Sequence, residues 1–360
     1  MSSVSAPVRG RGAASNPRHR FETLEREPSD DGWYRDDGEP PPLRTHVREE
    51  RCSSLIVRNA SPDLDFNLSI NPYRGCEHGC IYCYARPNHG YAGLSPGLDF
   101  ESRLSVKIDA VERLREELGA RDYRCEPINL GSATDAYQPV ERRYGLTRRL
   151  IEVMAAFRQP FTIVTKSSLI ERDIDLIAPM ARDGLAAVYV TVTTLDQQLA
   201  RRWEPRAAAP WRRLQTMRRL HEAGIPVGVS LAPVVPFLNE PEIERVLGAA
   251  RDAGADMAFY QVLRLPWELR ELFVEWLDTH YPERARRVLQ RLRELRGGEQ
   301  RARLNDPRFF SRMTGQGSWA ELIRLRFEMG LRRHRFGARR PALRTDLFRR
   351  EADGPQLGLF

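Results

Sequence analysis

The sequence predicts an α/β fold in which a parallel sheet is covered by helices and followed by a helical extension. Between residues 51 and 266, apolar β-branched stretches alternate about six times with segments whose apolar residues recur every three or four positions. Between residues 267 and 337 only the helical spacing remains. Strands that are apolar along their length and alternate with helices are typical of parallel sheets. We therefore expect one large domain with a helical appendage.

The expected strands are short runs rich in β-branched residues, and several end in polar or glycine-containing tips. A first short strand is expected at Ser54–Val57. The strands of the repeating units are expected at Phe66–Ile70, Ile128–Gly131, Phe161–Thr165, Ala187–Thr194, Val227–Leu231 and Met257–Leu263. Function in such folds gathers where the strands end, so the tips are the first place to look for a site.

The expected helices are segments whose apolar residues fall on one face. Asp196 is placed to cap the helix after the fourth repeating strand, because a side-chain oxygen there can accept the first backbone N–H groups. Within the repeats these segments are Leu146–Phe157, Ile174–Met180, Trp211–His221 and Ile243–Ala250. In the extension they are Leu269–Leu277, Val288–Leu295 and Ser318–Met329, the last opened by a capping box from Ser318 to Glu321.

Both ends of the chain differ in composition from its middle. Residues 1–50 are rich in Arg, Pro, Gly, Ser and Asp and show no apolar period, so we expect a flexible tail. Residues 338–360 are Arg-rich and are expected to be flexible up to the final five. No apolar run reaches the roughly 18 residues that a membrane helix needs, and the N-terminus lacks the apolar core of a secretory signal. We expect no membrane association.

Charge and cysteine usage narrow the function class. The 360 residues carry a formal net charge of +8, which favours polyanions such as DNA or RNA; a solvated charged surface explains it equally well. Three of the five cysteines are clustered. This pattern argues against a disulfide framework and for a reducing, cytoplasmic location.

The cysteine cluster is the strongest motif. Cys76, Cys80 and Cys83 lie in the stretch NPYRGCEHGCIYCYARP with the spacing Cys-x3-Cys-x2-Cys, and Tyr82 precedes the last of them. Thiolates are the soft ligands that hold iron–sulfur clusters. Four would fill every iron of a cubane, whereas three leave one iron open to bind and activate a ligand.

Two other interpretations of the cluster remain. Together with His78, the three cysteines make up a CCHC-type zinc site, although the ligand pairs of structural zinc sites are usually separated by a longer loop. They can also be ordinary buried thiols, but the polar, glycine-containing surroundings argue against a place in the core.

The spacing and its aromatic residue resemble the signature of the radical S-adenosylmethionine (SAM) superfamily. The resemblance implies a partial (β/α)6 TIM-like barrel of the radical SAM type, whose open side the C-terminal helices would close. It also implies a [4Fe–4S] cluster on Cys76, Cys80 and Cys83, whose open iron binds S-adenosyl-L-methionine. Reductive cleavage of SAM then gives methionine and a 5′-deoxyadenosyl radical, which requires an electron donor such as flavodoxin or ferredoxin.

Within that superfamily the chain most resembles the spore photoproduct lyase-like branch, whose namesake repairs a thymine dimer lesion in DNA. The matching stretches are CIYCYARP, GSATD, VTKSSLIERDIDLI, YVTVTT and residues 203–236. The resemblance places SAM-binding side chains at strand tips: Tyr82 at the adenine, Lys166 at the carboxylate, Ser132 and Thr134 at the amino group, and Thr191 nearby. Asp135 is expected to orient SAM or the substrate. Packing explains the tyrosine equally well, and strand propensity explains the threonine.

One departure from the branch concerns the hydrogen donor. The lyase carries a hydrogen-donating cysteine at the end of the second strand, where this chain has Ala133. Cys125 lies upstream and is expected to be a packed thiol. Tyr84 and Tyr137 are candidate radical relays, and packing explains each of them equally well. The missing thiol argues against direct reversal of a thymine dimer.

The last five residues read QLGLF. They resemble the QLxLF peptide by which bacterial replication and repair proteins dock onto the DNA sliding clamp. Leu357, Leu359 and Phe360 would enter an apolar groove while Gln356 fixes the orientation. The alternative is a short apolar tail that packs on the barrel.

The sequence thus predicts a cytoplasmic, lyase-like radical SAM enzyme that acts on damaged or modified DNA and belongs to DNA repair. Two alternatives remain. One is a radical SAM enzyme with a peptide or small-molecule substrate, and the other is a non-catalytic, metal-containing adaptor for the DNA clamp.

Overall fold

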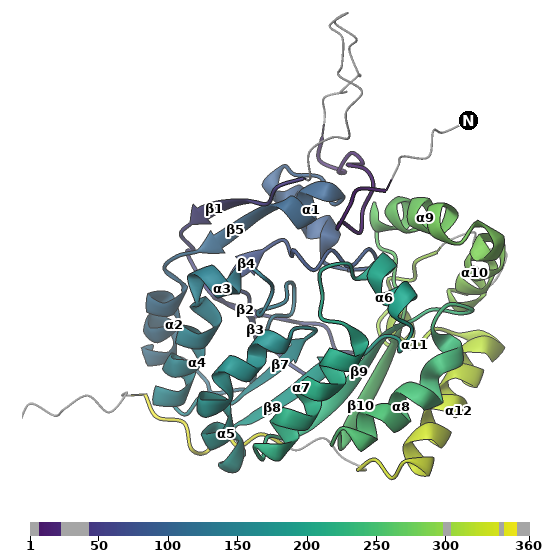
Figure 1. Ribbon diagram of the computed structural model, residues 1–360. Helices are drawn as coiled ribbons and strands as arrows, with labels where there is room; N and C mark the ends of the chain where they lie inside the picture. Colours follow the sequence, from purple (N-terminus) through teal and green to yellow (C-terminus); the bar gives the residue numbers. More distant parts are fainter. Residues whose placement is uncertain (1–6, 23–42, 298–303, 338–341, 351–360) are drawn as a thin grey trace, which may run out of the picture.

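The structure, a computed structural model, describes residues 7–22, 43–297, 304–337 and 342–350. Its centre is a seven-stranded sheet in the order β10-β9-β8-β7-β6-β3-β2. Neighbouring strands run parallel, except that β2 runs antiparallel to β3 at one edge. The sheet curves into a partial barrel with helices on its outer face (Figure 1). The α/β fold class predicted from the sequence is confirmed.

The strands of this sheet match the predicted runs, with shifts only at their ends. In the inner strands β3, β6, β8 and β9 the apolar side chains are buried between the barrel interior and the helices, which is why these runs lack polar alternation. In the edge strand β2, Val57 is exposed. The strands are β2 (Ile56–Arg58), β3 (Leu68–Ile70), β6 (Ile128–Leu130), β7 (Phe161–Thr165), β8 (Ala186–Thr191), β9 (Val227–Val234) and β10 (Met257–Val262).

The predicted helices within the repeats are also present. Asp196 caps α6 as expected, because its carboxylate accepts the amides of Gln198 and Leu199. The helices between strands are α2 (Ala110–Gly119), α3 (Glu141–Tyr144), α4 (Leu146–Ala156), α5 (Ile174–Arg182), α6 (Gln197–Trp203), α7 (Pro210–Glu222) and α8 (Ile243–Asp252), with short 3₁₀ turns at Ser168–Asp173 and Glu240–Glu242.

A second, three-stranded sheet was not predicted. It has the order β1-β5-β4 and is formed by β1 (His46–Glu50), β4 (Tyr73–Arg74) and β5 (Arg103–Lys107). A 3₁₀ turn at Arg86–Ala92 and the short helix α1 (Leu98–Ser102) lead into it. This sheet packs at the end of the barrel where the cysteine loop lies.

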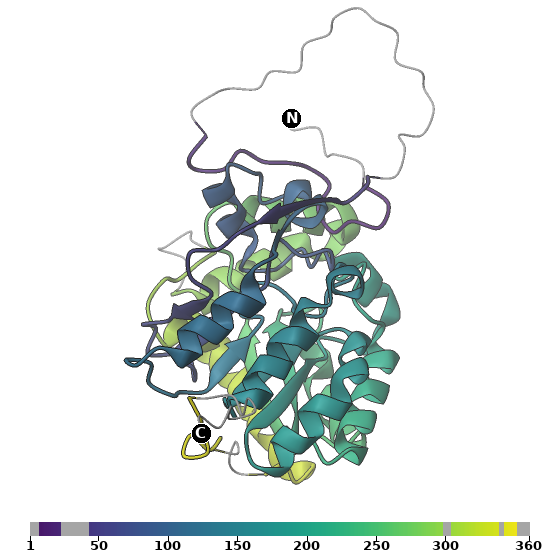
Figure 2. The same cartoon turned by 90° about the vertical axis from the view of Figure 1, so that its left-hand side faces the viewer.

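The prediction that residues 1–50 form a flexible tail is wrong for the described segments. Residues 46–50 pair in parallel with β5. Residues 7–22 run along the end of the barrel that holds α1 (Figure 2), where the Ser15 carbonyl accepts the Leu98 amide at 3.1 Å. Backbone and charged groups hold this segment in place. Because apolar packing contributes little, the segment has no hydrophobic periodicity from which it could be predicted.

In its described residues, the C-terminal extension forms four helices beside the edge strand β10. They are α9 (Leu269–His280), α10 (Pro282–Leu295), α11 (Ser311–Thr314) and α12 (Gly317–Arg333). Helix α12 packs on α8 and α10, and α11 contacts β10. The predicted capping box is wrong, because α12 begins before Ser318 and its N-cap, Gln316, makes no side-chain cap bond.

The prediction of a flexible tail from residue 338 is wrong for residues 342–350. Leu343, Leu347 and Phe348 pack against buried residues. The Arg344 amide donates to the Gly184 carbonyl at 2.9 Å, which joins this segment to the end of the barrel opposite the cysteine loop. The terminal QLGLF lies outside the described residues. No helix in the described part of the chain has the length and apolar character that crossing a bilayer requires.

Candidate active site

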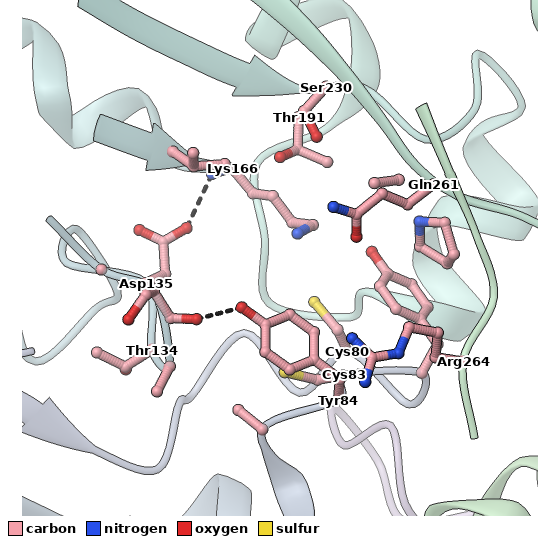
Figure 3. A pocket seen from close by; sticks show the side chains of 18 of the residues that line it. Cys80, Cys83, Tyr84, Thr134, Asp135, Lys166, Thr191, Ser230, Gln261 and Arg264 are labelled. Atoms are coloured by element: carbon pink, nitrogen blue, oxygen red, sulfur yellow. Dashed lines mark hydrogen bonds between the residues drawn. The ribbon is translucent and has the colours of Figure 1, made fainter. Parts of the chain in front are cut away.

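A cavity of ≈ 250 Å³ opens where the carboxyl ends of the parallel strands meet. The cysteine loop, residues 76–83, forms one wall, and the tips of β6 to β10 form the others (Figure 3). Parallel strands bring residues that are far apart in sequence to one edge in this way. Ten of the predicted site residues line the cavity: Cys76, Cys80, Tyr82, Cys83, Tyr84, Ser132, Thr134, Asp135, Lys166 and Thr191.

The three cysteines are free thiols on a loop with defined turns. The Cys76 amide donates to the Phe100 carbonyl at 2.9 Å, and the Cys83 amide donates to the Cys80 carbonyl at 3.1 Å. Cys76 and Cys80 are buried and Cys83 is partly buried. Burial raises the pKa of the Cys80 thiol to about 12 and raises the pKa of Cys76 well above its ordinary value. Metal binding would displace these protons.

The donor set fits an iron–sulfur cluster better than a single zinc ion. Among the described residues, no group of three His, Cys, Asp or Glu side chains is placed to hold one metal ion. His78, the fourth ligand of the zinc interpretation, has its Nδ1 3.2 Å from the Asp135 carboxylate. In a four-iron cluster each cysteine binds its own iron. The thiols therefore need to line one wall together, and these three do.

Glu204 is a fully buried acceptor that ties the cysteine loop to α7. Its carboxylate accepts hydrogen bonds from the Tyr82 hydroxyl, from Arg213 and from Thr193 Oγ1, the last at 2.9 Å. Burial raises the pKa of Glu204, but Arg213 and Lys166 outweigh that effect and hold it below its ordinary value. The Tyr82 ring, which packs edge-on against Trp203, is thereby fixed beside the cluster ligands.

The closeness of Glu204 and Arg206 in the sequence predicts an ion pair between them, and this prediction is wrong. Arg206 pairs with Glu77 at 3.1 Å, while Arg213 takes the place beside Glu204. Arg213 also donates to the Thr191 carbonyl at 3.1 Å. Sequence proximity favoured the wrong arginine, because Arg213 reaches Glu204 only once α7 has folded back against β8.

Lys166 follows β7 and extends its ammonium group into the cavity (Figure 3). Its Nζ lies 5.8 Å from the centre of the Tyr82 ring, and no residue in the described part of the chain forms an ion pair with it. Burial lowers the pKa of Lys166, but the charges of Cys80 and Glu204 outweigh burial and raise it above its ordinary value. Lys166 is therefore a cation whose donors are available to a carboxylate ligand.

Asp135 holds strand tips together. Its Oδ1 accepts the Thr165 hydroxyl at 2.7 Å and the Tyr137 amide at 2.9 Å. Its Oδ2 accepts the Lys166 amide at 2.8 Å (Figure 3) and lies 3.2 Å from His78 Nδ1. Both oxygens are engaged within the protein while Asp135 lines the cavity, and its role in orienting SAM or the substrate stays a prediction.

The two hydroxyls expected near the SAM amino group differ in their partners. The Thr134 hydroxyl donates to the Gly75 carbonyl at 2.8 Å and accepts from the Gln138 amide, also at 2.8 Å. The hydroxyl of Thr134 is therefore occupied by hydrogen bonds to the start of the cysteine loop and to Gln138. Ser132 Oγ accepts from Asn71 at 3.1 Å and keeps its proton to donate. Ser132 is the better placed of the two for a ligand.

Thr191, Ser230 and Gln261 present polar side chains to the cavity from β8, β9 and β10 (Figure 3). Ser230 and Gln261 were not predicted. Ser230 is a polar residue inside an otherwise apolar strand, and this break in the pattern is a signal from which a site residue could have been predicted. Gln261 lies where the pairing of β9 with β10 shifts register between Tyr260 and Val262. Such irregularities redirect side chains and leave no mark in the sequence.

Arg264 completes the far wall of the cavity and was also missed. Its Nε is buried without a hydrogen-bond partner, and its Nη1 lies 3.7 Å from the Met313 sulfur. Among the described residues no carboxylate lies within ion-pair distance of its guanidinium group. A guanidinium in this state is suited to a phosphate or a carboxylate of a ligand.

Of the two candidate radical relays, Tyr84 lines the cavity and Tyr137 does not; of the two remaining residues, Ala133 lines it and Cys125 does not. Tyr84 is half-exposed toward the cavity, and its hydroxyl donates to the Ser132 carbonyl (Figure 3). Tyr137 is fully buried in the core and does not line the cavity, so its predicted relay role loses its geometric basis. Ala133 does line the cavity. Cys125 lies outside it with its sulfur 3.6 Å from Gln159, as expected of a packed thiol.

Comparisons with known proteins agree with this site. A family model of the radical SAM superfamily matches residues 70–250. An uncharacterized protein of Mycobacterium tuberculosis is 37% identical over 251 residues, which cover 69% of this chain and 72% of that protein. An uncharacterized protein of Methanocaldococcus jannaschii is 28% identical over 219 residues, which cover 59% of this chain and 76% of that protein.

The solved structures with similar folds include several of spore photoproduct lyase. A tyrosine-to-phenylalanine mutant of that enzyme matches with a TM-score of 0.58 at 14% identity, covering 85% of this chain and 86% of that chain. Spore photoproduct lyase complexed with dinucleoside spore photoproduct matches with a TM-score of 0.50 at 15% identity, covering 66% of each chain. These likenesses concern the fold. With the family model and the cysteine-lined cavity, they lead to the conclusion that the chain belongs to the radical SAM superfamily, with the fold of its spore photoproduct lyase-like branch.

Proposed function

We propose that this chain is a radical SAM enzyme that holds a [4Fe–4S] cluster on Cys76, Cys80 and Cys83 and acts on a damaged or modified nucleotide in DNA. The observation that carries the proposal is one cavity in which three thiols and an unpaired ammonium group, that of Lys166, line the same space. When bound, the cluster and SAM supply a carbon-centred radical that can abstract hydrogen from a substrate.

The chain's own residues would bind and orient SAM. Lys166 is suited to the SAM carboxylate, because its ammonium group faces the cavity and has no carboxylate partner in the described part of the chain. Ser132 is suited to the amino group as an acceptor, because its hydroxyl oxygen has a second lone pair besides the one that accepts from Asn71. Tyr82, held by Glu204, offers a fixed flat surface to the adenine. Thr191 and Ser230 provide hydroxyl groups on the strand side.

A nucleotide substrate is favoured by the charge of the far wall. Arg264 faces the cavity without a carboxylate partner among the described residues, and the chain as a whole carries a formal net charge of +8. The fold is also that of an enzyme described in complex with a dinucleoside lesion. Ala133 leaves no thiol at the second-strand tip, so we propose the Tyr84 hydroxyl as the group that relays a hydrogen atom.

Two partners complete the proposal. Reductive cleavage of SAM consumes an electron, so a donor such as flavodoxin or ferredoxin is required. Gln356, Leu357, Leu359 and Phe360, which lie outside the described residues, are proposed to dock the enzyme on the DNA sliding clamp.

The test begins with anaerobic reconstitution of the full chain. We expect about four irons per chain, as for a cubane cluster, and release of 5′-deoxyadenosine after reduction with dithionite in the presence of SAM. Cys80→Ala should lose iron and SAM cleavage together. Cys125→Ala is the matched control, because that thiol lies outside the cavity, and it should retain both.

The substrate is then sought with a panel of lesion-bearing oligonucleotides, with product analysis by mass spectrometry. An oligonucleotide that becomes modified and raises the yield of 5′-deoxyadenosine identifies the substrate class. Zinc in place of iron, with no SAM cleavage, would leave the metal-containing adaptor as the better account. SAM cleavage that responds to a peptide and to no oligonucleotide would overturn the DNA assignment.

A further inference from the structure

The cysteine loop is held from behind by a segment that the sequence assigns to a tail. Residues 11–15, here called the N-terminal clamp, contact the loop, and none of them lines the cavity. The amides of Gly12 and Ala13 donate to Glu101, and Gly12 approaches the backbone of Gly79, which stands between Cys76 and Cys80. We infer that the N-terminal clamp is a structural part of the cluster site and that the three cysteines hold their cluster only when it is seated. This inference rests on the proposed cluster ligands.

The first support is a fully buried ion pair beneath the loop. Arg86 is 0% exposed and uses all five of its N–H donors. Its Nε donates to the Cys80 carbonyl at 2.8 Å and its Nη2 donates to the Gly79 carbonyl at 3.0 Å. Its Nη1 donates to the carbonyls of Pro96 and Gly97, and its remaining donor pairs with Glu101. The backbone at the second cysteine is therefore fixed by one guanidinium.

The second support is that Glu101 divides its carboxylate between Arg86 and the clamp. Its Oε2 accepts the Gly12 amide at 2.9 Å, and its Oε1 accepts the Ala13 amide, also at 2.9 Å. Arg11 adds a bond from its Nη1 to the Glu101 carbonyl at 2.6 Å. Removing the clamp would leave a buried carboxylate without two of its partners, and such groups are costly to leave unpaired.

The third support is a contact between two backbones. A Cβ atom on Gly12 would lie 1.8 Å from the Gly79 carbonyl oxygen, so only glycine fits there. Gly79 itself has φ +67°, and a Cβ atom on it would lie 2.6 Å from Glu101 Oε2. The two glycines let the clamp and the cysteine loop touch without intervening side chains. A methyl group on Gly12 must displace one of them.

The clamp has a second attachment that does not involve Glu101. Arg11 Nη2 donates to Thr45 Oγ1 at 3.1 Å, and the Thr45 hydroxyl donates to Glu77 Oε1 at 2.8 Å. Glu77 is the residue after Cys76, and its amide donates to Gln138 at 2.8 Å. The clamp thus reaches both halves of the loop, at Glu77 and at Gly79. Groups that hold metal ligands in place typically change metal affinity by about 10- to 100-fold when removed.

The test compares Gly12→Val with Gly119→Val in the full chain. Gly119 is the last residue of α2, has open space around its missing Cβ and does not have a positive φ, so the same substitution there meets no clash. After anaerobic reconstitution, the time course of iron loss to a chelator is followed by the visible absorption of the cluster. We expect Gly12→Val to lose iron at least about 10-fold faster than wild type, and Gly119→Val to behave as wild type.

A second measurement needs no cluster. Hydrogen exchange of the apoprotein should be faster in the peptide that spans residues 74–86 of Gly12→Val, with unchanged exchange in β7 and β8. If Gly12→Val does not fold, Arg11→Met serves instead, because it removes the bonds to Thr45 and Glu101 and keeps the side-chain stem; it should show the same two effects in smaller degree.

The outcomes separate the two proposals. Equal iron loss and equal exchange in wild type and variants would overturn the clamp. Wild-type protein that takes up no iron would overturn the proposed cluster, while the exchange measurement on apoprotein would still decide whether the clamp orders the loop.

Discussion

Charged side chains around the cavity divide into those that are satisfied by the protein and those that are not. Asp135 and Glu204 are buried acceptors whose oxygens are taken up by neighbouring residues. Lys166 and Arg264 face the same cavity, and neither has an ion-pair partner among the described residues. Partly buried cations that lack an ion-pair partner are unusual and often mark functional sites. We therefore propose that the two cations contact the ligand and that the two acids position their neighbours.

Arg264→Met tests this division at the level of one residue. The variant keeps the apolar stem beside Met313 and removes the donors. We expect oligonucleotide binding to weaken by about 1.5–3 kcal/mol, the usual worth of a hydrogen bond to a charged group, and the salt dependence of binding to become less steep by about one phosphate contact. Fluorescence anisotropy over a range of salt concentrations measures both.

Arg324→Met is the control for that experiment, since it changes the net charge equally on α12, where Arg324 pairs with Glu321 and Glu328. Iron content and SAM binding should match wild type in both variants. An equal loss of oligonucleotide affinity in the two would show that overall charge, and not Arg264, governs binding.

At the scale of elements, one ion pair joins the two edges of the barrel. Asp63 lies in the loop between β2 and β3, at one edge of the sheet, and Arg312 lies on α11, which contacts β10 at the other edge. Their side chains are 2.5 Å apart, and the Phe310 amide donates to Asp63 at 3.0 Å. Leu64 and Met313, the next residues along each segment, line the cavity. The pair therefore fixes the mouth of the site.

Asp63→Asn should destabilise the protein in a pH-dependent way. Arg312 lowers the pKa of Asp63 below its ordinary value of 3.8. A depressed folded-state pKa means that the stabilisation is present above pH 3.8 and is lost as the pH falls through the folded-state pKa. We expect a loss of about 1.5–3 kcal/mol in the free energy of unfolding at pH 7, which shrinks below pH 3.8. Denaturant unfolding followed by circular dichroism measures the difference.

Asp346→Asn provides the comparison, because Asp346 pairs with Arg344 on the exposed surface, where ion pairs contribute little to stability. A pH-independent loss in Asp63→Asn would mean that the amide disturbs the loop sterically and that the charge of Asp63 is not what joins the edges.

The same scale shows what a sequence can reveal. The strands β3 to β10 of the main sheet were predictable because each is a continuous apolar run with a polar tip, and those tips led to Lys166 and Thr191. The segment of residues 7–22 was not, because backbone bonds to Glu101 and Leu98 hold it, and such bonds have no compositional signature. Arg264 and Gln261 escaped for a related reason: what distinguishes them is a lack of partners and a register shift, which exist only in three dimensions.

At the scale of the whole molecule, a deletion of the C-terminal peptide tests the proposed docking of the enzyme on the DNA sliding clamp. Deleting Gln356 to Phe360 should abolish capture of the enzyme by immobilised sliding clamp, because the three apolar side chains and the glutamine are the whole of the proposed docking peptide. SAM cleavage should be unchanged, since the cavity lies elsewhere. Pulldown and 5′-deoxyadenosine assays on one preparation measure both.

Replacing the two leucines, Leu357 and Leu359, by alanine is the matched variant, which keeps the length of the tail. It should fail to be captured as the deletion does. Capture of either variant at wild-type level, or no capture of wild type, would remove the sliding clamp from the proposal.

The ion pair between Asp63 and Arg312 also limits how a long polymer can reach the chemistry. The pair joins the loop before β3 to α11 across the two edges of the sheet, so we expect no lateral entry of a nucleic-acid strand between these edges. If the substrate is DNA, a single unit must therefore be rotated out of its stack and inserted from above, as in base-flipping enzymes. Duplexes that are already weakened at the lesion would then be the preferred targets.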